Sequence, residues 1–290
     1  MNMREIEKKL MFMFDVDGVL VETPHEESWK DAAVSWKIIP SSYDFSEFYA
    51  ANVAGEPGLL GAHNILEKLM GREGERGYFR EHRIYKNRDK MMLARKFRET
   101  KQDIFDTYIE KGKFKVIDEI SRFVFELYDR NIPRAVVSSS ENAAKILSRI
   151  DAKALADRIG HDGITSIGKY SDLFNTHALG MLSHWNNPKT QKRDHYAMAR
   201  GMLMNSVGWK PEDGVPVTVV FEDAPKGIKA VKPLGFYTIG VTLDSGSGKP
   251  VEFQRQQMKA GANLLLTNQT LKTWTYDELI KDLERIYKRN

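Results

Sequence analysis

The chain has 290 residues, with 44 Lys and Arg against 40 Asp and Glu, which gives a formal net charge of +4. This length is enough for about two domains and for a core that folds without covalent crosslinks. The absence of cysteine excludes disulfides, thiol nucleophiles and Cys-ligated zinc, and it fits a reducing compartment, so we expect a cytoplasmic protein. The small positive charge does not indicate a nucleic-acid partner, and the apolar run near the N-terminus is too short for a signal peptide or a membrane span.

The first predicted element is a strand at Leu10 to Phe14. Its five consecutive apolar residues are typical of a strand that is buried on both faces. Asp15, Asp17 and Gly18 follow it, at the edge where open parallel sheets bind ligands. Taken alone, an Asp-x-Asp-Gly sequence is also typical of a simple polar turn. The later segments decide between these two interpretations.

Residues 23–115 are predicted to form a helical insert. They mix aromatic and charged residues at helical spacing, as in Ser28 to Val34, His63 to Met70 and Arg80 to Lys111. The part from Arg72 to Lys101 is rich in Lys and Arg, and it is either an anion-attracting lid or a solvated helix face. The interleaved aromatic residues favour the solvated face of an amphipathic helix.

Strands and helices alternate from Lys115 onward. A helix at Lys115 to Arg130 precedes a strand at Arg134 to Val137, which ends in Ser138. Further strands are predicted at 217–221, 237–241 and 264–267, and the first of them ends in Glu222 and Asp223. This alternation predicts a parallel sheet with right-handed crossovers.

The predicted fold class is α/β: a Rossmann-like parallel-sheet core with an inserted α-helical cap domain. The core is expected to comprise residues 1–22 and 116–290, and the cap residues 23–115. The stretch 151–187 lies within the core and receives no assigned element.

Four carboxylates and a serine are predicted to meet at one edge of this sheet: Asp15, Asp17, Glu222, Asp223 and Ser138. Carboxylates gathered in this way repel each other unless a cation lies among them. Oxygen ligands without His or Cys indicate Mg²⁺. A hard cation with a hydroxyl group and a nearby lysine suits phosphoryl transfer, in which positioning and charge neutralisation do most of the catalysis.

Three motifs resemble those of the haloacid dehalogenase superfamily of phosphotransferases. Phe12 to Leu20 (FMFDVDGVL) is similar to the first motif of that family, Val136 to Ser138 to its second, and Val219 to Gly235 (VVFEDAPKGIKAVKPLG) to its fourth. The resemblance covers the core and not the insert, whose size and position resemble the family's helical cap.

The resemblance implies a role for each acid. Asp15 would be the nucleophile that forms an aspartyl-phosphate, and Asp17 the general acid and base. Mg²⁺ would be held by Asp15, the Asp17 carbonyl group and Asp223, with Glu222 contributing directly or through water.

The resemblance also implies that Ser138 donates a hydrogen bond to the phosphoryl group, and Ser139 is a further expected substrate contact. The family's lysine usually stands in a Lys-Pro-x-Pro-Asp sequence. Here Lys189 is one residue too far from Asp194, and Lys192 is two residues too near. We expect Lys189 to be the catalytic lysine, with Lys192 as the alternative.

The cap carries two signals that point to different substrates. His25 and Trp29 resemble the cap entry of β-phosphoglucomutases, and Lys86-Asn87 resembles their sugar-contacting pair, so His25 and Lys86 are expected substrate contacts. Gly58 stands where those mutases carry an arginine that grips the distal phosphate. A bisphosphorylated intermediate needs such a clamp while it reorients.

We therefore expect a Mg²⁺-dependent phosphatase that acts on a small phosphorylated metabolite such as a sugar or polyol phosphate. A sugar phosphomutase of the β-phosphoglucomutase type is the alternative. A phospho-ligand-binding protein without catalytic activity is the alternative from another class. A dehalogenase is disfavoured, because it has no use for a second acid at Asp17. The expected chain is a monomer or homodimer without nucleic-acid or membrane partners.

Overall fold

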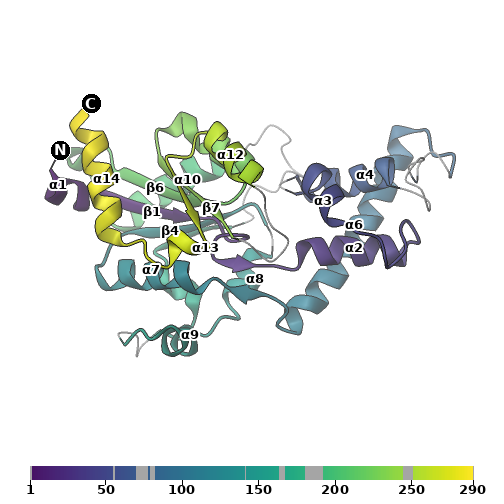
Figure 1. Cartoon of the computed structure of the whole chain (residues 1–290), viewed down its shortest axis with the longest axis horizontal. Coiled ribbons are helices and arrows are strands. Elements are labelled where there is room, and N and C mark those ends of the chain that lie inside the picture. The colour runs from purple at the N-terminus through teal and green to yellow at the C-terminus, as the bar shows by residue number, and fades with distance from the viewer. Residues whose placement is uncertain are drawn as a thin grey trace. The chain divides into compact units, whose positions relative to one another are not determined.

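The computed structural model describes residues 2–54, 56–69, 78, 82–140, 142–162, 167–179, 192–243 and 251–289. The chain divides into two compact units, residues 1–22 with 115–290 and residues 23–114 (Figure 1). The sequence placed the second of these boundaries between residues 115 and 116.

The first unit contains a parallel sheet of six strands in the order β5-β4-β1-β6-β7-β8. These strands are β1 (Leu10–Phe14), β4 (Arg134–Ser138), β5 (Thr176–Leu179), β6 (Val217–Glu222), β7 (Tyr237–Thr242) and β8 (Leu264–Thr267). The predicted α/β class is confirmed. β1 lies inside the sheet between β4 and β6, so the ends of these three strands are neighbours.

Two layers of helices flank this sheet. The helices of the first unit are α1 (Met3–Glu7), α7 (Asp118–Asp129), α8 (Ala143–Leu147), α9 (Ala152–Ile159), α10 (Lys192–Ser206), α11 (Pro225–Val231), α12 (Val251–Ala260), α13 (Asn268–Leu271) and α14 (Tyr276–Arg289), with short 3₁₀ turns at Tyr170–Leu173, Pro211–Asp213 and Lys232–Leu234. Met11 and Met13 of β1 pack in one cluster with α10, whereas Phe12 contacts Phe123 of α7 on the opposite face. Alternate residues of β1 therefore serve opposite layers.

Five of the six strands follow the predicted apolar runs, and β5 was not predicted. Its residues, Thr-His-Ala-Leu, alternate between buried and less buried positions, and among the described residues β5 pairs only with β4. A short strand at the sheet edge carries no continuous apolar run that would reveal it. The predicted helix at Lys115 to Arg130 is also shorter than expected, since its first residues form strand β3 (Lys115–Val116).

Strand β3 pairs with β2 (Val21–Glu22) in an antiparallel two-stranded ribbon. Val21 lies opposite Val116, and Glu22 lies opposite Lys115. The chain leaves the first unit directly after β2 and returns to it at β3.

The second unit is helical in its described residues. It contains α2 (His25–Ser35), α3 (Ser46–Asn52), α4 (Gly58–Lys68) and α6 (Asn87–Glu110). These helices enclose their own buried cluster, which includes Trp29, Phe45, Ile65 and Phe97. Among the described residues, no helix is both long and apolar enough to cross a membrane.

Candidate active site

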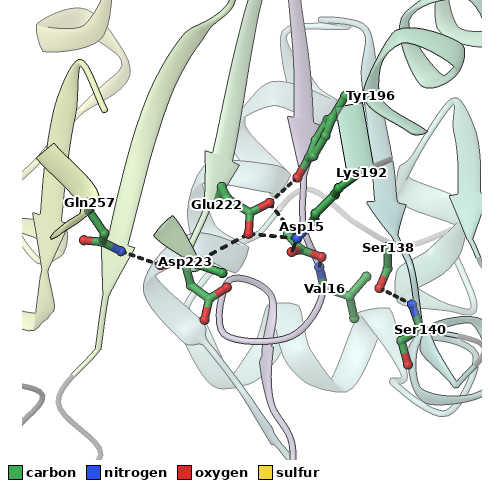
Figure 2. A network of polar contacts seen from close by, with 10 residues as sticks. Asp15, Val16, Ser138, Ser140, Lys192, Tyr196, Glu222, Asp223 and Gln257 are labelled. Atoms are coloured by element: carbon green, nitrogen blue, oxygen red, sulfur yellow. Dashed lines mark hydrogen bonds and ion pairs between the residues drawn. The ribbon is translucent and has the colours of Figure 1, made fainter. Parts of the chain in front are cut away.

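Asp15 is the first residue after β1 and is almost fully buried, at 5 % exposure. It continues the β1 face that carries Met11 and Met13, so it points toward α10. The Val16 N–H donates to Oδ1 at 2.8 Å, and Lys192 Nζ donates to Oδ2 at 2.6 Å. Both oxygens of Asp15 are therefore held in place (Figure 2).

Glu222 ends the neighbouring strand β6 and is fully buried. Its carboxylate accepts hydrogen bonds from Lys192 Nζ at 2.9 Å, from the Tyr196 hydroxyl at 2.6 Å and from the Ala224 N–H at 3.2 Å. Lys192 thus bridges the carboxylates that end two adjacent strands (Figure 2). A buried carboxylate needs such donors, because its charge is otherwise expensive to remove from water.

The surrounding charges shift the pKa values in this cluster. Burial, followed by the negative charge of Asp15, raises the pKa of Glu222 to about 8, although Lys192 acts in the opposite direction. Burial lowers the pKa of Lys192, but Asp15 and Glu222 outweigh it, so the net pKa lies above its usual value. Burial, reinforced by Glu222, also raises the pKa of Tyr196 well above normal. Lys192 is therefore cationic, and Tyr196 keeps the proton that it donates.

Asp17 and Asp223 lie on the two turns that follow β1 and β6. Gly18 adopts a φ of 76°, and its N–H donates to the Val21 carbonyl at 2.8 Å, which closes the first turn. A Cβ atom at residue 18 would overlap the Asp223 carboxylate. The glycine therefore lets the two turns approach each other closely.

The acidic residues satisfy the geometric requirement for a shared cation. Asp15, Glu222 and Asp223 each offer one carboxylate oxygen, and these atoms lie within 4.8 Å of one another. An all-oxygen donor set of this kind suits Mg²⁺. The donor set therefore fits Mg²⁺, the ion that the sequence implied. Asp17 is half-buried on the turn that follows Asp15.

The predicted serines follow β4, the other neighbour of β1. Ser138 is the last residue of that strand and is buried, and its Oγ accepts a hydrogen bond from the Ser140 N–H at 3.1 Å. Ser139 is exposed. Because Val136 pairs with Phe14, Ser138 lies at the same sheet edge as Asp15.

Among the described residues, the lysine that contacts Asp15 is Lys192, the first residue of α10. Lys189 lies outside the described residues. Lys192, the alternative candidate, reaches both buried carboxylates, Asp15 and Glu222. The sequence analysis did not identify Tyr196, although it follows Lys192 by one helical turn and so shares its helix face.

In the second unit, His25 contacts a lysine that the sequence analysis did not identify. Lys101 Nζ lies 2.9 Å from His25 Nδ1, and the His25 ring stacks on Phe105 with a centroid distance of 4.3 Å. Lys101 is 5 % exposed, and its ammonium group lies 4.3 Å from the centre of the Phe105 ring. The His25 imidazole and the Phe105 ring therefore hold the buried ammonium group of Lys101 within the second unit.

The other predicted cap residue, Lys86, is exposed at the N-cap of α6. It precedes Lys101 by fifteen residues on the same chain segment, a separation of about 22 Å along a helix axis. The structure therefore does not bring Lys86 to His25, and Lys101 occupies the position beside His25 instead.

No protein-family model and no curated protein matches this chain. Solved structures do. An archaeal β-phosphoglucomutase from the hyperthermophile Pyrococcus sp. strain ST 04 matches with a TM-score of 0.67 and 24 % identity, over 94 % of this chain and 98 % of its own. A β-phosphoglucomutase of Clostridium difficile matches with a TM-score of 0.58 and 18 % identity, over 97 % of this chain and 99 % of its own.

A predicted phosphoglycolate phosphatase of Haemophilus somnus also shares the fold, with a TM-score of 0.54 and 13 % identity, over 91 % of this chain and 94 % of its own. At these identities the likeness shows a shared fold. It confirms, at the level of the fold, the predicted resemblance to β-phosphoglucomutases and related phosphatases. Since mutases and a phosphatase share this fold, the fold alone does not select a reaction.

Proposed function

We propose that this protein is a Mg²⁺-dependent phosphatase that hydrolyses a small phosphate ester through an aspartyl-phosphate intermediate. The observation that carries this proposal is the Asp15 carboxylate, which is held by Lys192 and the Val16 N–H beside the carboxylates of Glu222 and Asp223. Such an arrangement provides an oriented nucleophile within a site suited to a hard cation.

In the first step, a carboxylate oxygen of Asp15 attacks phosphorus, and the bond between phosphorus and the ester oxygen breaks. Asp17 gives its proton to the departing alkoxide. In the second step, Asp17 accepts a proton from water as that water attacks the phosphorus, which releases inorganic phosphate and restores the Asp15 carboxylate. Lys192 offsets the negative charge of the Asp15 carboxylate before the attack and after the carboxylate is restored.

The proposed Mg²⁺ would be held by Asp15, the Asp17 carbonyl group and Asp223, with Glu222 contributing directly or through water. Bound Mg²⁺ would neutralise charge on the transferring phosphoryl group. Ser138, at the end of β4, supplies a hydroxyl group for the same phosphoryl oxygens.

Replacing Asp17 by asparagine should leave the binding of substrate and Mg²⁺ nearly intact while slowing turnover. The amide keeps the size and the backbone carbonyl of the aspartate but transfers no proton. We expect kcat to fall by about 10²- to 10⁴-fold, which is typical for the loss of one acid–base group. Steady-state kinetics with magnesium titration measures both effects, and an unchanged kcat would assign proton transfer to another residue.

One contact in the second unit favours the mutase alternative. A Cβ atom at Gly58 would lie 3.0 Å from Arg98 Nε, so the side chain of Arg98 fills the space beside the glycine. The sequence disfavours a mutase because no arginine stands at residue 58. Arg98, on α6, brings a guanidinium group to this position from another helix, and a guanidinium group can clamp a phosphate with two hydrogen bonds.

Product analysis separates the two reactions. With β-glucose 1-phosphate and a panel of small sugar and polyol phosphates, we expect release of inorganic phosphate and little glucose 6-phosphate. Phosphorus NMR follows both products in one sample, with and without a sugar bisphosphate. Rapid isomerisation with negligible free phosphate would establish the mutase, and loss of that isomerisation in Arg98→Ala would identify its anchor.

A further inference from the structure

Helix α12 has one buried side chain, the polar Gln257. Gln257 is 0 % exposed, whereas Val251 and Met258 on the same helix are 64 % and 50 % exposed. An apolar side chain of similar size would gain free energy on burial, whereas an amide loses it unless its donors and acceptor are satisfied. Attachment of α12 to the sheet therefore does not explain why a glutamine is buried at residue 257.

The amide of Gln257 makes three hydrogen bonds, which use both N–H groups and the oxygen. Its Nε2 donates to the backbone carbonyl of Asp223 at 2.6 Å and to that of Val241 at 3.0 Å, and its Oε1 accepts from Thr242 Oγ1 at 2.6 Å. Carbonyl oxygens only accept hydrogen bonds, so they require the nitrogen side of the amide and fix its orientation. Figure 2 shows this side chain reaching the turn that carries Asp223.

The peptide unit between Asp223 and Ala224 is held at both of its ends. Gln257 binds its carbonyl oxygen, and the Glu222 carboxylate accepts its N–H at 3.2 Å. The peptide that follows Asp223 is thus fixed, and Gly18 packs against the Asp223 side chain. Asp223 therefore has little freedom to turn its carboxylate away from Asp15 and Glu222.

We propose that Gln257 is a positioning residue for the metal site, which it serves by fixing the backbone of Asp223. This inference rests on the proposed Mg²⁺ site. Groups that orient a metal ligand from behind typically change metal affinity by about 10- to 100-fold when they are removed. Gln257 acts at a backbone carbonyl group, so its effect should fall on ion affinity and not on the chemistry of the loaded enzyme.

The test replaces Gln257 by methionine, which has a similar length and no hydrogen bonds. Mg²⁺ binding is measured by isothermal titration calorimetry in the absence of substrate, and activity is measured as a function of Mg²⁺ concentration. We expect the dissociation constant for Mg²⁺ to rise by about tenfold or more, with kcat at saturating Mg²⁺ nearly unchanged. Gln257→Asn keeps a buried amide that is too short to reach Asp223, and it provides the same measurement if the methionine variant does not fold.

Thr242→Val is the matched control. It removes the buried hydrogen bond to Oε1 of the same amide but leaves both Nε2 contacts, so it should lower stability without weakening Mg²⁺ binding. Equal Mg²⁺ affinity in wild type and Gln257→Met would overturn the inference, as would equal weakening in Gln257→Met and Thr242→Val. A wild-type protein that does not bind Mg²⁺ would overturn the metal site itself, and the role of Gln257 with it.

Discussion

Replacing Asp15 by asparagine should abolish turnover, with a fall in kcat of roughly 10⁴-fold or more, the scale observed when enzymes lose a covalent nucleophile. The amide retains the size of the carboxylate, but it is a far weaker nucleophile and forms no stable acyl phosphate. Steady-state release of inorganic phosphate measures the loss. Beryllium fluoride with Mg²⁺ should bind wild type as a mimic of the aspartyl-phosphate, and fluorine NMR should show no such species in the variant.

The control for this experiment is Asp157→Asn, which makes the same substitution at an exposed position on α9. It should retain wild-type activity and the beryllium fluoride signal. Substantial phosphate release by Asp15→Asn, after chromatography that excludes contaminating phosphatase, would move the nucleophile to another residue.

Replacing Lys192 by methionine should affect both stability and catalysis. Lys192 is the cation shared by Asp15 and the fully buried Glu222. Removing one partner of a buried ion pair typically costs about 3–5 kcal/mol, because the remaining charge is left without compensation. Loss of a preorganised donor should also lower kcat by about 10²- to 10³-fold.

The stability loss in Lys192→Met should depend on pH in a defined direction. The pKa of Glu222 is raised to about 8 even with Lys192 present, so the stability from its bound proton is complete below its usual pKa and is lost as the pH rises through 8. Without Lys192 this pKa lies higher still. In metal-free buffer the gap between variant and wild type should therefore widen from pH 5 to pH 9.

Urea unfolding at several pH values measures this gap. Lys229→Met, at an exposed position on α11, provides the control and should unfold like wild type at each pH. A gap that narrows with rising pH would show that Lys192 does not compensate Glu222.

The strands that place Asp15, Glu222 and Asp223 were predictable, because buried parallel strands leave a continuous apolar run. Leu10 to Phe14 and Val217 to Phe221 are such runs, and each ends directly in acidic residues. The end of β1 and the end of β6 meet because these strands are hydrogen-bonded neighbours. Sequence pattern and parallel topology together were therefore enough to gather Asp15, Glu222 and Asp223.

The side chains that come from helices were harder to predict. Lys101 lies on the buried face of α6 together with Ala94, Phe97 and Phe105. The helical spacing of these apolar residues places Lys101 among them, so periodicity could have identified it, whereas counting charged residues could not. Gln257 had no such signal, because its partners are backbone atoms of distant segments. Contacts of this kind depend on tertiary packing and leave no trace in local periodicity.

The pairing of β2 with β3 separates the helical insert, residues 23–114, from the six-stranded sheet. Its entry and exit strands are opposite each other on one ladder, with Val21 facing Val116, and the buried cluster around Trp29 and Phe97 is built from residues of the insert. An insert of different length or sequence can therefore replace this one without shifting the register of the six-stranded sheet. The insert can therefore change while Asp15, Glu222 and Asp223 keep their places at the edge of the sheet.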